Sequence, residues 1–187
     1  MRETFAFLGQ AVTRFRSTGA VVPSSRRLAR AMAAEVGDLA PGAVIVELGP
    51  GTGVFTRELA QRFPDHRLVA VEFNHQFAAA LRAQLPRVAV VEGCASQLPD
   101  HLRRLGIDPG RVQAVVSGLP LLSLPRELGD RILAAIRDTL PIGGRYVQFT
   151  YAKAPWRTRR PGGFTAARAR RVWVNFPPAL VLPFVRD

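Results

Sequence analysis

The sequence predicts an α/β domain in which helices cover both faces of a mostly parallel sheet. Three observations in its 187 residues carry this prediction. Short β-branched runs alternate with helical segments between residues 43 and 151, a pattern typical of repeated strand–helix units. The first of these runs leads directly into a glycine-rich turn. Two apolar runs near the C-terminus are expected to pair antiparallel and close one edge of the sheet.

Two helices are expected ahead of the sheet. Over residues 3–17, apolar side chains recur at helical spacing while basic ones lie mostly off that face. The apolar positions are Phe5, Leu8, Val12 and Phe15, and the basic ones are Arg14 and Arg16. A second helix follows Ser24 and Ser25, which are N-cap candidates. We therefore divide the chain into an N-terminal helical segment, 1–36, and a sheet domain, 37–187.

The elements of the sheet domain follow from the alternation. The expected strands cover 43–48, 67–72, 88–92, 112–116, 145–151, 172–176 and 179–184. The expected helices cover 54–62, 75–85, 95–105 and 124–140, and a basic loop spans 153–171. The prediction is a seven-stranded sheet whose parallel strands end at a common edge, where ligands bind in open α/β sheets.

Composition narrows the class of protein. The 48% hydrophobic and 21% charged residues argue against a disordered chain, and no apolar run reaches the roughly 18 residues needed to span a bilayer. The N-terminus carries no recognisable signal peptide. The single cysteine, Cys94, excludes an internal disulfide framework and gives no support for a zinc cluster. We therefore expect a cytoplasmic protein without a metal.

The net charge of +12 predicts an anionic partner. Nearly all of the basic residues are arginines, which bind phosphate groups bidentately. Charge alone leaves two partners open, a nucleic acid and an anionic membrane surface.

The glycine-rich turn, Glu47-Leu48-Gly49-Pro50-Gly51-Thr52-Gly53, indicates the ligand. Its spacing is G-x-G-x-G, whereas the dinucleotide fingerprint needs its third glycine one position later. Glu72 ends the next strand, where a carboxylate can accept from both hydroxyls of a ribose. Phe73 can cover an adenine, and Glu47 can accept from an ammonium group. Ribose, adenine and ammonium without pyrophosphate describe S-adenosylmethionine.

A family resemblance agrees with this ligand. The segments E-L-G-P-G-T-G and V-E-F-N resemble the cofactor motifs of class I S-adenosylmethionine-dependent methyltransferases, which have a Rossmann-like fold. Within that superfamily the chain resembles the bacterial phospholipid N-methyltransferases over nearly its whole length. The further matching segments are Gly19–Ser25, Ser117–Pro120, Gln148–Tyr151 and Val174–Ala179. The resemblance implies methylation of phosphatidylethanolamine and its mono- and dimethylated intermediates towards phosphatidylcholine.

The same resemblance, together with the strand ends, gives a set of candidate cofactor residues. They are Glu47, Gly49, Pro50, Gly51, Thr52, Gly53, Glu72, Phe73, Asn74, Gly93, Cys94, Ala95, Ser117 and Gly118. One position departs from the family, whose members often carry an acidic residue after the glycine that ends the third strand. Here Cys94 follows Gly93, and a thiol is a weak hydrogen-bond acceptor.

Methyl transfer to an amine requires a neutral amine that is correctly positioned and shielded from water. Ser117 and Tyr151 end two neighbouring strands and are the candidate catalytic positions. Tyr151 can contact the headgroup through its hydroxyl and a methylated ammonium through its ring, or can be an ordinary strand-end aromatic. Tyr146 begins its strand and is expected at the opposite edge. His66 and His101 are expected in exposed stretches.

Two segments are expected to hold the protein on the inner face of a bacterial cytoplasmic membrane as a peripheral enzyme. The first is the helix over 3–17 with Ser24 and Ser25 behind it, and the second is the basic loop with its neighbouring tryptophans. The loop's basic residues are Lys153, Arg157, Arg159, Arg160, Arg168, Arg170 and Arg171, with Trp156 and Trp173 nearby. Each basic side chain near an anionic surface contributes roughly 1 kcal/mol. A lid helix and a solvated loop are the alternatives.

Two other functions remain open. An rRNA adenine N6-dimethyltransferase would share the fold, the cofactor and the basic charge. Such enzymes carry an Asn-Leu-Pro-Tyr-like motif after the fourth strand, whereas this chain has Ser117 and Leu121 at the outer positions. We therefore expect no stable nucleic-acid partner. A basic adaptor without catalytic activity is the second alternative, and failure to bind S-adenosylmethionine would favour it.

Overall fold

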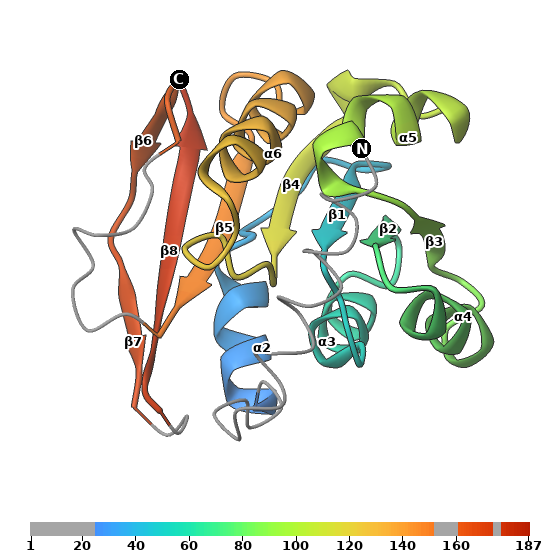
Figure 1. The fold of residues 1–187 in the computed structure, drawn as a ribbon, viewed down its shortest axis with the longest axis horizontal. Coiled ribbons are helices and arrows are strands. Elements are labelled where there is room, and N and C mark those ends of the chain that lie inside the picture. The colour runs from blue at the N-terminus through green and yellow to red at the C-terminus, as the bar shows by residue number, and fades with distance from the viewer. Residues whose placement is uncertain (1–24, 152–160, 174–176) are drawn as a thin grey trace.

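A computed structural model of the chain describes residues 25–151, 161–173 and 177–187 (Figure 1). The helices are α2 (Arg26–Ala34), α3 (Val54–Arg62), α4 (His75–Gln84), α5 (Leu98–Arg104) and α6 (Arg126–Thr139), with short 3₁₀ turns at Ala95–Gln97 and Pro109–Arg111. The strands are β1 (Val44–Leu48), β2 (Arg67–Glu72), β3 (Ala89–Glu92), β4 (Val112–Ser117), β5 (Arg145–Thr150), β6 (Phe164–Ala166), β7 (Arg170–Val172) and β8 (Ala179–Arg186).

The strands form one sheet with the order β3-β2-β1-β4-β5-β8-β6. The first five strands of the chain run parallel to one another, and β8 runs antiparallel to β5 (Figure 1). The sheet order reverses between β1 and β4, which is the point where open α/β sheets bind their ligands. The predicted α/β class, with its mostly parallel sheet, is therefore confirmed.

The antiparallel end of the sheet differs from the expected hairpin in one respect. The described residues form eight strands rather than seven, because β8 pairs with β7 along its first half and with β6 along its second. The antiparallel pairing of this end is confirmed, since Val172 lies opposite Ala179, but β7 covers Arg170–Val172 and not the expected 172–176, of which 174–176 lie outside the described residues. The additional strand, β6, has only three residues and lies inside the expected basic loop. Three residues are too few to show an alternating pattern.

The helices cover both faces of the sheet, as predicted. On one face α5 and α6 pack over the sheet through Leu102, Ile132 and Ile136. On the other face α2 and α3 pack through Leu28, Met32 and others around the middle strands. All five residues of β1 are buried, because helices cover both of its faces. Within the described ranges, no helix combines the length and apolar character needed to cross a membrane.

Helix α2 shows how the N-terminal segment joins the domain. The Ser25 side chain accepts from the backbone N–H of Leu28 at 3.1 Å, so Ser25 is the N-cap that the sequence predicted. One face of α2 is fully buried against α3 and the sheet. The other N-cap candidate, Ser24, and the helix expected over 3–17 lie outside the described residues.

We expect the Ser25→Ala variant to lose about 1 kcal/mol of stability, because one N–H at the start of α2 loses its acceptor. For a chain of this size, this corresponds to a fall in melting temperature of about 2–4 °C. Thermal unfolding followed by circular dichroism measures the change. The exposed Ser123, which precedes α6, provides the control Ser123→Ala. An equal loss in both variants would contradict the capping role.

Candidate active site

The loop between β1 and α3 is shaped by glycines in the left-handed region. Gly49, Gly51 and Gly53 have φ angles of 69°, 56° and 78°. A Cβ added at Gly51 would meet no atom within 4 Å, so this part of the loop faces open space. A ligand can therefore approach the backbone closely at Gly51.

Gly118, directly after β4, packs against this loop. A Cβ at Gly118 would lie 2.8 Å from the Gly49 carbonyl oxygen, which is closer than van der Waals contact allows. The Gly118 N–H donates to the Leu48 carbonyl at 2.8 Å. The close approach of the two backbones requires a glycine at this position.

Glu72, at the end of β2, organises the same loop from its other side. Its Oε2 accepts from the Gly51 N–H at 2.9 Å and its Oε1 accepts from the Asn74 N–H at 2.8 Å. The carboxylate is 5% exposed. Each oxygen has a further lone pair, so Glu72 holds the loop and can still accept from a ribose. The structure thus brings this carboxylate to the glycine loop, and its contact with a ribose stays a prediction.

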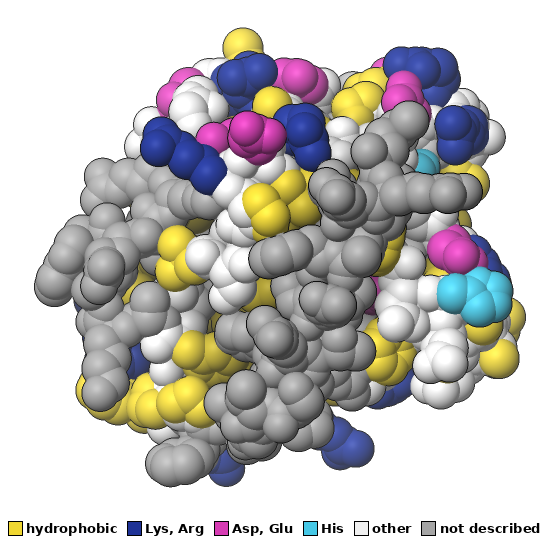
Figure 2. Space-filling view, in the orientation of Figure 1, with side chains coloured by type: hydrophobic (Ala, Val, Ile, Leu, Met, Phe, Trp, Pro, Cys, Tyr) yellow, Lys and Arg dark blue, Asp and Glu magenta, His cyan; other side chains and the backbone are white. Residues whose placement is uncertain are grey.

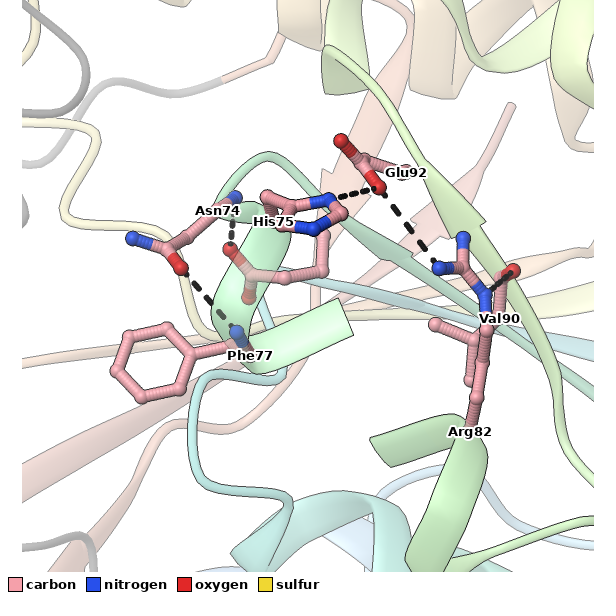
Figure 3. A network of polar contacts seen from close by, with 7 residues as sticks. Asn74, His75, Phe77, Arg82, Val90 and Glu92 are labelled. Carbon is pink, nitrogen blue, oxygen red and sulfur yellow. Dashed lines mark hydrogen bonds and ion pairs between the residues drawn. The ribbon is translucent and has the colours of Figure 1, made fainter. Parts of the chain in front are cut away.

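Asn74 begins α4 and closes the turn after β2 (Figure 3). Its side-chain oxygen accepts from the Phe77 N–H at 3.1 Å, which makes Asn74 the N-cap of α4. Beside it, His75 Nδ1 lies 2.9 Å from Glu92 Oε2, and Arg82 also faces Glu92 (Figure 3). Phe73 is partly buried against the core, and its predicted contact with an adenine stays a prediction.

Glu47 is the most unusual group of the site. It is fully buried on β1, and neither carboxylate oxygen has a hydrogen-bond partner among the described residues. Burial raises its pKa from 4.5 to about 8, although the hydroxyl and backbone N–H of Thr56, which lie close to the carboxylate but outside the geometry of a full hydrogen bond, oppose part of this shift. A buried carboxylate without a partner costs stability. It therefore marks a place where a cationic group of a ligand is expected.

The end of β3 contributes Gly93, Cys94 and Ala95. Cys94 Sγ lies 3.1 Å from Ser96 Oγ, and Ala95 is buried. His101 was expected to be exposed, but it is 4% exposed and its Nε2 lies 3.1 Å from the Cys94 carbonyl oxygen. The expectation was wrong because α5 turns this residue towards the loop. A Cβ at Gly93 would lie 2.5 Å from the His101 ring, so the two residues fit closely together.

The two candidate catalytic positions lie in different surroundings. Ser117 is fully buried, and its hydroxyl accepts from the Leu119 N–H at 3.3 Å. Tyr151, just beyond β5, is half-buried and packs on the α2–α3 side, with its ring 5.3 Å from that of Phe149. Their catalytic roles stay predictions.

Tyr146 and Gln148 were not among the candidate site residues. Tyr146 was expected at the opposite edge, yet its hydroxyl donates to Gln148 Oε1, and the amide of Gln148 donates to the Leu119 carbonyl at 3.0 Å. The two residues are two positions apart in β5, so their side chains lie on the same face, and the long phenol side chain spans the distance between them. The spacing of two within a predicted strand was the signal that could have identified this pair.

Several predicted membrane contacts fall outside the described residues. They are Phe5, Leu8, Val12, Arg14, Phe15, Arg16, Ser24, Lys153, Arg157, Arg159 and Arg160. Of the basic segment, Arg168, Arg170 and Arg171 are described and exposed, and Trp173 is 69% exposed. The guanidinium of Arg171 lies 4.9 Å from the centre of the Trp173 ring. In the described ranges, no group of three or more His, Cys, Asp or Glu side chains could hold a metal ion.

Comparisons with known proteins agree with this geometry. Residues 45–144 match the family described as a methyltransferase domain. The ornithine lipid N-methyltransferase of Singulisphaera acidiphila is 34% identical over 160 residues, which cover 83% of this chain and 81% of the relative. The ribosomal RNA small subunit methyltransferase A of Thermotoga petrophila is 31% identical over 135 residues. These residues cover 62% of this chain and only 49%, or about half, of that relative.

A solved structure gives the same fold. The 1,6-didemethyltoxoflavin-N1-methyltransferase of Burkholderia thailandensis superposes with a TM-score of 0.71 at 19% identity, covering 100% of this chain and 90% of that one. That structure contains S-adenosylhomocysteine, the product form of the cofactor. At this identity the likeness shows the fold alone.

The residues at the edge of the sheet fit S-adenosylmethionine as the cofactor. Glu47 offers a buried carboxylate for an ammonium group, and Glu72 offers one for the ribose hydroxyls. Gly51 leaves room for the ligand beside the loop. Gly93 and Cys94 follow β3 at the same edge, and their contact with the adenine stays a prediction.

Proposed function

This chain belongs to the methyltransferase-domain family, with S-adenosylmethionine as its cofactor, and from that premise we propose that it methylates the amine of a membrane lipid. The proposed substrate is phosphatidylethanolamine, and the products are its mono- and dimethylated forms and phosphatidylcholine. The observation that supports a lipid most strongly is the 34% identity to an ornithine lipid N-methyltransferase, which extends over 83% of the chain. That relative methylates the nitrogen of a lipid, which is the same class of acceptor.

The residues of the chain prepare the reaction by holding and shielding the reactants. When bound, the cofactor supplies a methyl group on a positively charged sulfur. Glu47 would hold its ammonium group and Glu72 its ribose. The backbone after β4 lies against the glycine-rich loop over 49–53, which is called the cofactor loop from here on. The amine must arrive neutral, so it loses a proton before transfer. Tyr151, beyond the end of β5, is the proposed headgroup contact.

The loop after β4 favours a lipid amine over an adenine base. The Leu-Pro pair of the four-residue motif of adenine N6-dimethyltransferases falls on Leu119 and Pro120. Its outer positions, which carry an amide and an aromatic ring in those enzymes, therefore fall on Gly118 and Leu121 rather than on Ser117 and Leu121. Leu121 is 5% exposed and belongs to the core, so it offers no surface on which a base could stack. The 31% identity to an rRNA methyltransferase keeps RNA as the second candidate acceptor.

The proposed location is the surface of the cytoplasmic membrane, with anionic lipids as partners. On α5 and α6, basic and acidic side chains are interspersed, as Figure 2 shows along the top of the view. In contrast, residues 161–173 contain Arg168, Arg170 and Arg171 and no acidic residue. β7 pairs with the start of β8, which itself pairs with the end of β5, so Trp173 lies at the same edge as the cofactor loop. Exposed tryptophan and arginine suit a headgroup layer.

The test of the substrate uses S-adenosylmethionine labelled in its methyl group. The protein is incubated separately with vesicles containing phosphatidylethanolamine, with vesicles containing ornithine lipid, and with rRNA. Label in methylated phosphatidylethanolamine is the expected result. Label confined to ornithine lipid would keep the lipid class and overturn the headgroup, and label confined to RNA would overturn the proposal.

We expect Arg171→Glu to weaken binding to anionic vesicles about tenfold or more, because each basic side chain near such a surface contributes roughly 1 kcal/mol and the reversal adds repulsion. Sedimentation with vesicles containing phosphatidylglycerol measures the partition at low and high salt. Arg104→Glu, which changes the charge equally at the exposed end of α5, is the control. Equal loss of binding in the two variants would argue for net charge instead of a specific surface.

A further inference from the structure

A buried polar chain crosses from β5 to the loop after β4. Tyr146 is 1% exposed and Gln148 is 8% exposed, and the hydroxyl of the first donates to the amide oxygen of the second. The amide nitrogen of Gln148 donates to the Leu119 carbonyl at 3.0 Å. Gln148 lies opposite Ser117 in the register of β4 and β5. The methyl-transfer chemistry described above uses neither Tyr146 nor Gln148.

The tyrosine fixes which way the amide points. Burial raises the pKa of Tyr146 above its ordinary value, so the phenol keeps its proton at every physiological pH. A phenol that donates requires an acceptor, and this turns the oxygen of Gln148 towards Tyr146. The NH₂ group must then face the Leu119 carbonyl. The Ser117 hydroxyl also lies near the phenol and opposes part of the rise in its pKa, whereas the ring of Tyr146 contacts those of Phe164 and Phe184.

Leu119 connects this polar chain to the cofactor loop. Its carbonyl also accepts from the Leu121 N–H at 2.9 Å, so two donors meet at one oxygen. Its side chain lies over Gly49, where an added Cβ would come within 2.5 Å of Leu119 Cδ2. A movement of Leu119 would therefore shift the loop after β4 and, at the same time, change the contact of the Leu119 side chain with the cofactor loop.

We propose that Gln148 is a positioning residue, whose amide holds the Leu119 carbonyl and so keeps the loop after β4 against the cofactor loop during methyl transfer. Tyr146 acts through Gln148 by fixing the orientation of its amide. The inference rests on the proposed methyl transfer for its activity measurement. It does not depend on which acceptor is correct, because the same loop lies beside the cofactor loop for any acceptor.

The decisive variant is Gln148→Glu. The carboxylate can still accept from Tyr146, but in its ionised form it cannot donate to Leu119 and repels that carbonyl. We expect kcat to fall about 10- to 100-fold at pH 8.5, since small displacements of a positioning loop cost this much, while the Kd for S-adenosylmethionine changes less than about threefold. The ratio of variant to wild-type kcat should recover towards lower pH, because a protonated carboxyl can donate again.

Two further variants separate positioning from general stability. Tyr146→Phe should lower kcat by about 3- to 10-fold, because the amide of Gln148 loses the partner that orients it. Thr139→Val removes another buried hydrogen bond, from Oγ1 to the Ala135 carbonyl at 2.8 Å, on α6 and outside this chain of contacts. It should lower the melting temperature and leave kcat unchanged. Equal losses of kcat in all three variants would overturn the positioning role.

A measurement without any acceptor keeps the inference separate from the proposed function. Hydrogen exchange of the Leu121 amide reports directly on the loop, because this N–H donates to Leu119. Gln148→Glu should speed its exchange at least about tenfold, whereas Thr139→Val should not. Unchanged exchange together with unchanged kcat would refute the inference. If the wild-type protein methylates RNA rather than lipid, kcat is compared with RNA as the substrate. The proposed lipid substrate is then wrong, while the role of Gln148 is still tested.

Discussion

Replacing Glu47 with glutamine is expected to lower the affinity for S-adenosylmethionine by about 10- to 100-fold, because a hydrogen bond to a charged group contributes roughly 1.5–3 kcal/mol. The same variant should be more stable than the wild type without ligand at pH 8 and above. There the wild-type protein contains a buried carboxylate whose oxygens have no partner among the described residues. A gain of about 1 kcal/mol would raise the melting temperature by about 2–4 °C.

The pH dependence of the wild type follows from the same carboxyl group. Its pKa is 4.5 in the unfolded chain and about 8 in the folded one, so the folded state binds the proton more tightly. The stability of the ligand-free protein should therefore decrease as the pH rises from about 4.5 to 8 and stay level above that. Affinity for the cofactor should change in the opposite direction, rising towards pH 8, because the ammonium requires the ionised carboxylate.

Isothermal titration calorimetry and thermal unfolding between pH 6 and 9 measure both effects. Glu127→Gln, at an exposed position of α6, is the matched control and should leave affinity and stability unchanged. In Glu47→Gln both pH dependences should largely disappear. Unchanged affinity in this variant would show that the ammonium group binds elsewhere.

The cofactor side of the site could be predicted because it depends on local patterns. Helix 54–62 and strand 67–72 occur with the predicted bounds. Glu47 and Glu72 lie where a strand–turn–helix unit and its neighbouring strand place them. Each of these features rests on a few consecutive residues and on parallel strands that end at one edge.

The acceptor side could not be predicted because it depends on the reach of side chains across the sheet. Strand position alone placed Tyr146 at the far edge, yet its phenol extends along the strand to Gln148. The burial of His101 depends on how α5 rotates over the end of β3. The β6 strand exists because the second half of β8 offers a free edge, and its own three residues carry no signal.

Replacing Glu72 with glutamine is expected to lower the affinity for S-adenosylmethionine by about 100-fold or more, a larger loss than that of Glu47→Gln. The carboxylate accepts from the Gly51 and Asn74 N–H groups with its two oxygens, at 2.9 Å and 2.8 Å. A glutamine has one acceptor oxygen, so its NH₂ group must face one of these donors. The loop then loses a charge-assisted hydrogen bond, which contributes roughly 1.5–3 kcal/mol. The ribose loses one of its two acceptor oxygens and the negative charge of the carboxylate.

The stability of Glu72→Gln should move in the opposite direction to that of Glu47→Gln. We expect a loss of about 2 kcal/mol and a fall in melting temperature of about 4–8 °C. The control is Glu92→Gln, because Glu92 lies directly opposite Glu72 in the register of β2 and β3. Within the described part of the chain, the side chain of Glu92 pairs with the surface side chains of His75 and Arg82, so its variant should keep affinity within about threefold.

The sign of the stability change separates the roles of the two carboxylates. Glu72 already has backbone partners in the protein without ligand, so its removal costs stability before any cofactor binds. Glu47 has none among the described residues, and we expect its partner to be the ammonium group of the cofactor. If both variants lost stability, Glu47 would be a structural group like Glu72. If both kept full affinity, the edge of the sheet between β1 and β2 would not be the cofactor site.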